Sequence, residues 1–93
     1  MVRKFHNARV LLATYILVCE TDGGANPNRP CIFPFKYKGK RYTTCTLKDA
    51  ENTNNKAWCS TQVDRFGNHV RGRGKWGNCG QDCPFPDLDT NGE

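Results

Sequence analysis

Six cysteines in a chain of 93 residues constrain the fold more than any other feature of this sequence. A chain this short buries little apolar surface, so covalent cross-links are expected to supply much of its stability. This cysteine content is typical of secreted domains that fold in an oxidising compartment. The sequence therefore predicts a single small disulfide-rich domain, with little room for the scaffold of a typical enzyme.

Residues 1–18 have the layout of a secretory signal peptide. The basic residues Arg3, Lys4 and Arg9 precede a run of ten almost wholly apolar residues, 10–19, and a polar stretch follows. The competing interpretation of the apolar run is a buried β-strand. The run is shorter than the roughly 18 residues that a membrane-spanning helix needs, so no transmembrane segment is expected. The sequence predicts a secreted, extracellular protein.

The position of signal cleavage decides how many cysteines can pair. Cleavage after residue 18 keeps Cys19, and all six cysteines can then form bridges. The small residues Gly23 and Ala25 instead favour cleavage after Ala25, which removes Cys19 and leaves five. The sequence leaves both alternatives open. The predicted organisation is a signal-like segment 1–18, a domain 19–84 and an acidic tail or linker 85–93.

The segment 33–42 predicts a β-hairpin. Its aromatic residues Phe33, Phe35 and Tyr37 alternate with Pro or Lys, and a period of two is typical of a strand. The Lys-Gly-Lys sequence at 38–40 then indicates a turn, after which β-forming residues resume. We expect Phe33 and Phe35 to face the core.

The rest of the region up to Cys83 predicts short strands separated by long loops. The sequences AWCSTQV and KWGNC, which carry Trp58 and Trp76, are short strand candidates. The polar segments 46–56 and 64–75 lack apolar periodicity and are expected to be surface loops. No helix of useful length is expected, so the pattern favours a small, mostly β fold.

The residues from Cys31 to Cys79 resemble the fibronectin type II domain. The matching residues are Cys31, Phe33, Pro34, Phe35, Tyr37, Gly39, Tyr42, Cys45 and Thr46, then Trp58, Cys59, Ser60 and Thr61, then Lys75, Trp76, Gly77 and Cys79. The resemblance covers residues 31–79 and implies a small all-β, disulfide-rich, kringle-like fold with two short antiparallel sheets and long loops.

The resemblance also implies a disulfide pattern, which the cysteine count alone does not fix because six cysteines allow 15 connectivities. It pairs Cys31 with Cys59 and Cys45 with Cys79. Cys19 and Cys83 then flank the domain and are left to close a third, outer bridge.

A ligand site of exposed aromatic residues is a further implication of the resemblance. The matching positions are Tyr37, Trp58 and Trp76; Phe66 is a substitute for a Tyr of the family's Asn-Tyr-Asp segment, which this chain lacks. Such rings stack on extended collagen-type chains or hold a quaternary ammonium group. Because Phe66 has no hydroxyl group for a phosphate, collagen, gelatin or another extracellular protein is favoured over phosphorylcholine. The alternative role of these rings is core filler.

Basic residues form two groups within a net charge of +5. The first group lies in the loop 64–75 and comprises Arg65, Arg71, Arg73 and Lys75, with His69. The second lies on the hairpin and comprises Lys36, Lys38, Lys40 and Arg41. If both groups lie on one face, they make a patch for a sulfated glycan or an acidic protein; otherwise they belong to a solvated loop. A nucleic-acid partner is not expected, because no recognition motif is present.

Catalysis, a metal and a cofactor are not expected. His69 is the one histidine outside the signal-like segment, and its spacing from Cys79 and Cys83 is poor for zinc. The predicted function is a secreted, non-catalytic module that binds an extracellular protein. The alternatives are an auxiliary targeting domain of a secreted trypsin-like serine protease zymogen, a phosphorylcholine- or glycosaminoglycan-binding module, and a purely structural disulfide scaffold.

Overall fold

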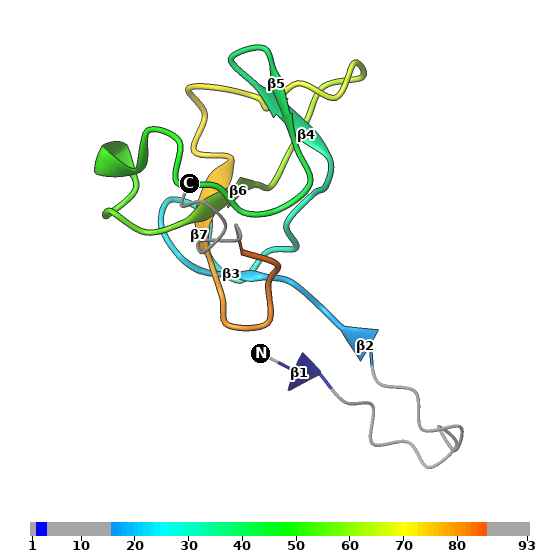
Figure 1. Cartoon of the computed structure of the whole chain (residues 1–93), viewed down its shortest axis with the longest axis vertical. Helices are drawn as coiled ribbons and strands as arrows, with labels where there is room; N and C mark the ends of the chain where they lie inside the picture. The colour runs from blue at the N-terminus through cyan, green and yellow to red at the C-terminus, as the bar shows by residue number, and fades with distance from the viewer. Residues whose placement is uncertain (1, 4–15, 86–93) are drawn as a thin grey trace, which may run out of the picture.

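The computed structural model of the chain describes residues 2–3 and 16–85. Two small antiparallel sheets make up the domain, and a third pair of strands, β1 (Val2–Arg3) and β2 (Ile16–Leu17), lies at its N-terminal side (Figure 1). Most of the predicted signal-like segment lies outside the described residues, as does most of the predicted acidic tail. No helix among the described residues is long and apolar enough to cross a membrane.

The predicted hairpin is confirmed. Strand β4 (Phe35–Tyr37) pairs with strand β5 (Lys40–Tyr42), and Tyr37 lies opposite Lys40. The two turn residues, Lys38 and Gly39, have φ values of 51° and 80°, as a tight two-residue hairpin turn requires. The strand begins at Phe35 rather than Phe33, because Pro34 lacks the N–H group that a ladder hydrogen bond needs.

The second sheet has the order β3-β7-β6 and lies below the hairpin in Figure 1. Strands β6 (Trp58–Ser60) and β7 (Trp76–Cys79) were expected, whereas β3 (Thr21–Gly23) falls in a polar stretch that gave no strand pattern. A Cβ atom at Gly77 would lie 2.5 Å from Thr21 Cγ2. Glycine at this position therefore allows β3 to pack closely on β7.

Three disulfides tie this sheet to the rest of the chain. The pairs are Cys19–Cys83, Cys31–Cys59 and Cys45–Cys79, the same pairs that the resemblance implies. The two inner bridges lie side by side, with 3.9 Å between Cys31 Sγ and Cys79 Sγ. The small core therefore contains sulfur as well as rings.

Phe35 is fully buried at the centre of this core. Its ring lies 5.4 Å from that of Tyr42 and 5.3 Å from that of Trp58, and Phe33 packs against the same cluster from a half-buried position. Such ring contacts add to the stabilisation that burial of apolar area provides. The hairpin and the three-stranded sheet are thus joined through aromatic contacts with Trp58.

The two long loops are held at defined points. Loop 46–56 contains a short 3-10 helix, η2 (Ala50–Asn52), and its Thr53 is buried, because the buried Asn78 side chain donates a hydrogen bond to the Thr53 carbonyl at 2.8 Å. The expectation that the whole segment is a surface loop was therefore wrong at Thr53, and also at Thr46, which is buried. The other loop is closed by a 2.8 Å hydrogen bond from Thr61 N–H to the Lys75 carbonyl.

Candidate functional site

A pocket of about 160 Å³ opens between the hairpin, the η2 loop, the sheet and the loop after β6. Its lining residues are Tyr37, Asp49, Asn52, Thr53, Trp58, His69, Arg71, Gly72 and Trp76. The structure therefore brings together three of the predicted aromatic residues, Tyr37, Trp58 and Trp76. A cavity this small takes a single side chain, since pockets for drug-sized ligands are typically about 300–1,000 Å³.

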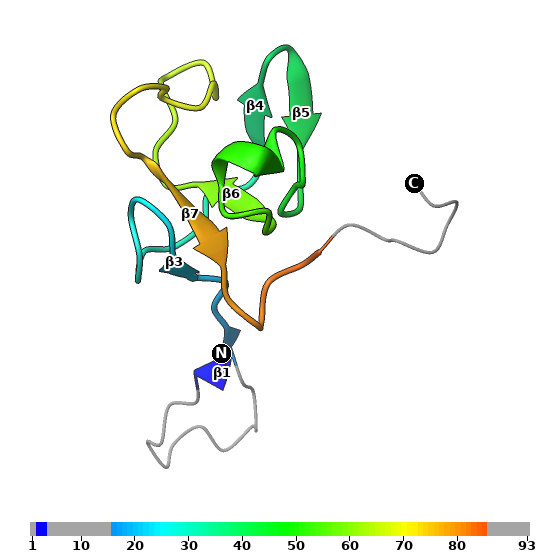
Figure 2. The ribbon, with the colours of Figure 1, turned by 90° about the vertical axis from the view of Figure 1, so that its left-hand side faces the viewer.

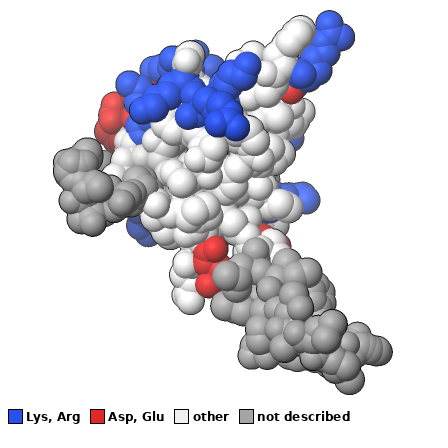
Figure 3. All heavy atoms as spheres, turned by 45° about the vertical axis from the view of Figure 1, so that its right-hand side comes forward, with Lys and Arg blue, Asp and Glu red and all other residues white. Residues whose placement is uncertain are grey.

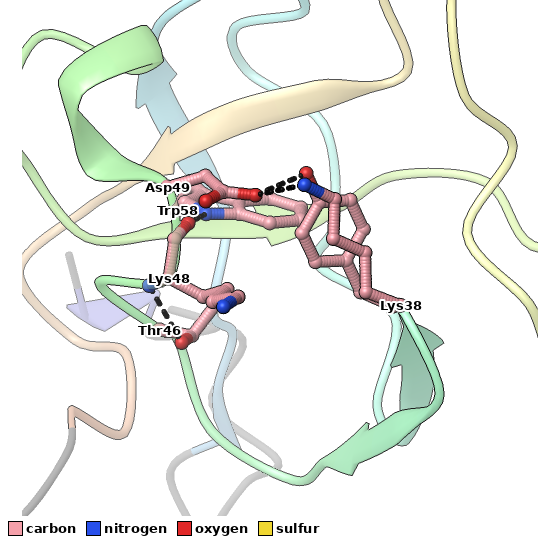
Figure 4. A network of polar contacts seen from close by, with 6 residues as sticks. Lys38, Thr46, Lys48, Asp49 and Trp58 are labelled. Carbon is pink, nitrogen blue, oxygen red and sulfur yellow. Dashed lines mark hydrogen bonds and ion pairs between the residues drawn. The ribbon is translucent and has the colours of Figure 1, made fainter.

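Trp58 contributes a buried part of this lining and is not an exposed ligand residue. It is 3% exposed, so the prediction that it belongs to an exposed cluster was wrong. Its indole Nε1 donates a 2.7 Å hydrogen bond to the Lys48 carbonyl, which satisfies the polar end of a buried indole (Figure 4). The Tyr37 ring meets Trp58 edge-on at 5.0 Å. Tyr37 and Trp76 are half-buried and offer the accessible ring surface.

Asp49 links the pocket wall to the hairpin (Figure 4). One of its carboxylate oxygens, Oδ2, accepts a 2.7 Å hydrogen bond from the Tyr37 hydroxyl and lies 2.8 Å from Lys38 Nζ. These two contacts hold the pKa of Asp49 below its ordinary value. The pKa of Tyr37 is raised, first by burial and then by the hydrogen bond to Asp49. Asp49 is therefore a carboxylate whose charge is balanced within the protein.

His69 forms another wall of the pocket. Its Nδ1 lies 2.7 Å from the hydroxyl of the buried Ser60, and that hydroxyl donates in turn to the Gln62 carbonyl at 2.8 Å. Ser60 uses its one hydroxyl proton in the bond to Gln62, so its oxygen can only accept a hydrogen bond from His69. The N–H group of the neutral imidazole is therefore at Nδ1. Burial lowers the pKa of His69, and the positive charge of Arg71 lowers it further. The imidazole is accordingly neutral at pH 7.

Phe66 does not line the pocket, so the expected substitution for the family's tyrosine does not occur. Phe66 is 64% exposed, and the centroid of its ring lies 5.0 Å from Arg65 Cζ. The backbone explains this position, because Asp64 Oδ1 accepts hydrogen bonds from the N–H groups of Phe66 and Asn68 and folds them into a tight turn. That turn carries Phe66 outward.

The basic loop and the basic hairpin are neighbours. The Lys36 N–H donates to the Gly67 carbonyl at 2.9 Å, and the His69 N–H donates to the Lys36 carbonyl at 2.8 Å. Figure 3 shows Lys and Arg side chains gathered toward one end of the molecule. Of the four predicted patch residues in the loop, Arg71 also lines the pocket, whereas Arg65, Arg73 and Lys75 do not.

Sequence reasoning missed Asp49, Asn52, Thr53 and His69 as pocket residues. The first three lie in a loop without periodicity. Contacts with distant segments bring that loop to the pocket, among them the hydrogen bonds that it accepts from Tyr37, Trp58 and Asn78. His69 was considered only for catalysis, metal binding and the basic group. Its place beside the rings of Tyr37 and Trp58 follows from the backbone pairing of residues 67–69 with Lys36.

The described residues offer no free metal-binding cluster. The one group of potential ligands with suitably close atoms consists of Cys19, Cys31, Cys45, Cys79 and Cys83. All five are engaged in disulfides, so none presents the thiolate that a metal requires.

The fold and the pocket together define a small disulfide-linked binding module. The chain belongs to the fibronectin type II domain family, whose sequence model matches residues 31–79. This is a family of non-catalytic binding modules. No solved structure gives a significant match to the chain.

Three relatives are large proteins that contain a similar segment. The chain is 38% identical over 60 residues to the human cation-independent mannose-6-phosphate receptor, covering 64% of the chain and 2% of the receptor. It is 39% identical over 57 residues to matrix metalloproteinase-9 of Canis lupus familiaris, covering 61% of the chain and 7% of that protein. It is 41% identical over 44 residues to the 72 kDa type IV collagenase of Gallus gallus, covering 47% of the chain and 6% of the collagenase. The chain thus spans only a small fraction of these relatives.

Proposed function

We propose that this protein is a secreted, non-catalytic module that binds an extracellular protein of the collagen or gelatin type through the aromatic pocket. The observation that carries the proposal is the pocket itself, in which the half-buried rings of Tyr37 and Trp76 border a cavity sized for one side chain. Family membership supports a binding role, and one relative is named as a type IV collagenase.

Denatured collagen suits such a pocket for physical reasons. Proline-rich chains adopt an extended, polyproline II conformation before they bind, so they lose little conformational entropy on binding. Their rings present flat apolar faces that pack on Tyr and Trp. Proline recurs along such a ligand, so one ligand chain offers this cavity many equivalent binding positions.

Replacement of Trp76 by Ala tests this proposal directly. We expect Trp76→Ala to weaken binding to immobilised gelatin by about tenfold or more, as the loss of a central aromatic contact does. Phe66→Ala is the matched control, because it removes an exposed ring that lies outside the pocket. Binding is measured by surface plasmon resonance, and circular dichroism establishes that both variants fold. Equal affinity of the two folded variants would overturn the proposal and favour a purely structural scaffold.

We further propose that the secreted chain begins at or before Cys19, so that Cys19 is retained. Cleavage after Ala25 would remove strand β3 and leave Cys83 without its partner. Strand β3 covers one edge of β7, so its loss would expose the backbone of a buried strand. The intact mass of the secreted product gives the cleavage site, and a loss of about 6 Da relative to the reduced chain corresponds to three bridges.

A sulfated glycan is a second candidate ligand, supported by the adjacent basic loop and hairpin. The two sites predict different mutational patterns, because a patch of exposed charges is sensitive to Arg65 and Lys40, whereas the pocket depends on Trp76. Phosphorylcholine is less well supported, since Phe66 lies outside the pocket and supplies no hydroxyl. A targeting domain within a larger secreted protease would use the same pocket on the same type of ligand.

A further inference from the structure

The charges around the pocket do not balance. On one wall, Asp49 is neutralised by Lys38, whose ammonium group lies 2.8 Å from the carboxylate. On the other wall, the guanidinium group of Arg71 lies 5.5 Å from the centroid of the Tyr37 ring. Among residues 16–85, no carboxylate lies within ion-pair distance of Arg71. Within residues 16–85, the pocket therefore carries one positive charge that no neighbouring carboxylate compensates.

Arg71 is held at the pocket entrance by the backbone on both sides. The preceding residue, Val70, donates its N–H to the Gln62 carbonyl at 3.0 Å, and the loop closes again where Thr61 donates to the Lys75 carbonyl. Gly72 and Gly74 have φ values of 76° and 69°, a left-handed conformation that favours glycine and lets the loop turn tightly. Stacking on Tyr37 further restricts the exposed guanidinium.

A guanidinium group in this position recognises a particular chemical group. Its N–H donors form paired hydrogen bonds with the two oxygens of a carboxylate, and the pair is strengthened where apolar rings exclude water. A ligand ammonium group would instead approach an uncompensated positive charge, which costs free energy. The same pocket thus favours an acidic ligand residue and disfavours a basic one.

We propose that Arg71 makes the pocket selective for an extended peptide in which an Asp or Glu residue lies next to the apolar residue that fills the cavity. This inference rests on the proposed function, because it assumes that the aromatic pocket is the peptide site. It narrows the ligand from any proline-rich chain to acidic proline-containing segments. Arg71 is thereby a specificity-determining residue.

Three blocked peptides of equal length provide the test: repeats of Gly-Pro-Glu, of Gly-Pro-Gln and of Gly-Pro-Lys. Calorimetric titration of the full chain should show that the Glu peptide binds about five- to tenfold more tightly than the Gln peptide, and the Lys peptide most weakly. The Glu preference should decline as salt rises from low to physiological ionic strength, because the charge pair is partly solvent-exposed.

Arg71→Gln should bind the Glu and Gln peptides equally. Arg73→Gln is the matched control, since it removes the same charge from an exposed position that does not line the pocket, and it should keep the preference. Loss of the preference in both variants would overturn the assignment to Arg71 and indicate a general surface-charge effect.

The outcomes separate this inference from the proposed function. If the wild-type protein binds the Glu and Gln peptides equally and Trp76→Ala weakens both, the pocket is the peptide site but selectivity by Arg71 is wrong. A preference for the Lys peptide also overturns the inference. If neither gelatin nor any of the peptides binds the wild-type protein, the proposed function fails together with it.

Discussion

The sheet β3-β7-β6 and the rim of the pocket are held together by different forces. The sheet carries Cys59 and Cys79, each of which forms a disulfide to a distant segment, and its strands exchange backbone hydrogen bonds. The rim consists of the hairpin, the η2 loop and the loop 61–75. Two backbone hydrogen bonds join the hairpin to the loop 61–75, and side-chain contacts such as the hydrogen bond from Tyr37 to Asp49 join it to the η2 loop. No disulfide links these three segments to one another.

Because of this difference, the residues that stabilise the fold lie on other segments than the residues that set which ligand binds. Trp58 and Trp76 extend from strands of the covalently linked sheet, so the ring surface is set by the fold. Arg71, Asp49 and His69 lie on segments without cysteines, where the sequence can change without loss of a bridge. The loop after Cys59 supplies the charge at the pocket entrance, through Arg71. Figure 2 shows that this loop and the hairpin extend from the same side of the sheet.

Removal of an inner disulfide should have the largest effect. The Cys45→Ala, Cys79→Ala double variant opens a loop with a sequence separation of 34, which lowers the free energy of unfolding by about 4 kcal/mol in the chain-entropy model. Loss of the fully buried Cys45 sulfur adds to this cost. Urea unfolding followed by Trp fluorescence measures the change. A variant that unfolds cooperatively with nearly wild-type stability would contradict the view that covalent links hold the sheet.

The two tryptophans should divide between stability and binding. Trp58→Ala should lower the free energy of unfolding by about 3–5 kcal/mol, because Trp58 is 3% exposed and packs on Phe35. Trp76→Ala should cost less stability and more affinity, because its ring is half-buried at the pocket. Thermal unfolding and gelatin binding are measured on both variants. Similar loss of stability in both would remove the distinction between the buried ring and the accessible one.

His69 should make stability depend on pH below the ordinary imidazole pKa of about 6.5. Burial lowers its pKa in the folded state, so as pH falls through the ordinary value of 6.5 the unfolded chain takes up a proton before the folded chain does. The free energy of unfolding is therefore highest above pH 6.5 and declines below it, until the pH reaches the pKa of His69 in the folded state. The thermal midpoint should fall from pH 7.5 to pH 5 in the wild type.

His69→Gln is the comparison for this effect. Glutamine keeps a polar side chain beside Ser60 but does not titrate, so the decline over this pH range should be smaller than in the wild type. Any contribution of His6 cancels between the two proteins. Asp49 and Asp64 have lowered pKa values in the folded protein, so the stability that they contribute is lost only at more acidic pH. An equal decline in both proteins would assign the effect to other groups.

The smallest effect concerns the link between Asp49 and the hairpin. Asp49→Ala removes the acceptor of the Tyr37 hydroxyl and the neighbouring negative charge, so the pKa of Tyr37 should move down toward its ordinary value. The thermal midpoint should change little, because partly exposed ion pairs such as Lys38–Asp49 contribute little to stability. Ultraviolet absorption at alkaline pH follows the titration. Glu51→Ala, in the same loop but outside the pocket, should leave it unchanged.

The sequence predicted the parts of the fold that depend on local pattern. The alternation of aromatic residues predicted β4 and β5, and Trp58 and Trp76 were placed on strands. Strand β3 was missed because residues 21–23 are too polar and too few to show periodicity; they form a strand only because β7 lies beside them. The bridge pattern came from the resemblance, because spacing alone could not select it.

The candidate site was harder to predict, because it is built from contacts between distant segments. Tyr37 and Trp76 were found, but the burial of Trp58 depends on its contact with Phe35 and on the Lys48 carbonyl that accepts its N–H. Asp49 reaches the pocket through a hydrogen bond across 12 residues of sequence. No local pattern encodes such contacts.

The central claim is that the aromatic pocket, and no other surface, is where an extended peptide binds. A two-dimensional ¹H–¹⁵N NMR titration of the isotopically labelled chain with the Gly-Pro-Glu peptide tests it most directly. We predict that the largest shifts fall on the indole N–H of Trp76 and on the backbone of Tyr37, Arg71 and Gly72, whereas Phe66 and the β3 residues stay unchanged. Saturable shifts confined to Phe66, Arg65 or the outer hairpin residues would contradict the account.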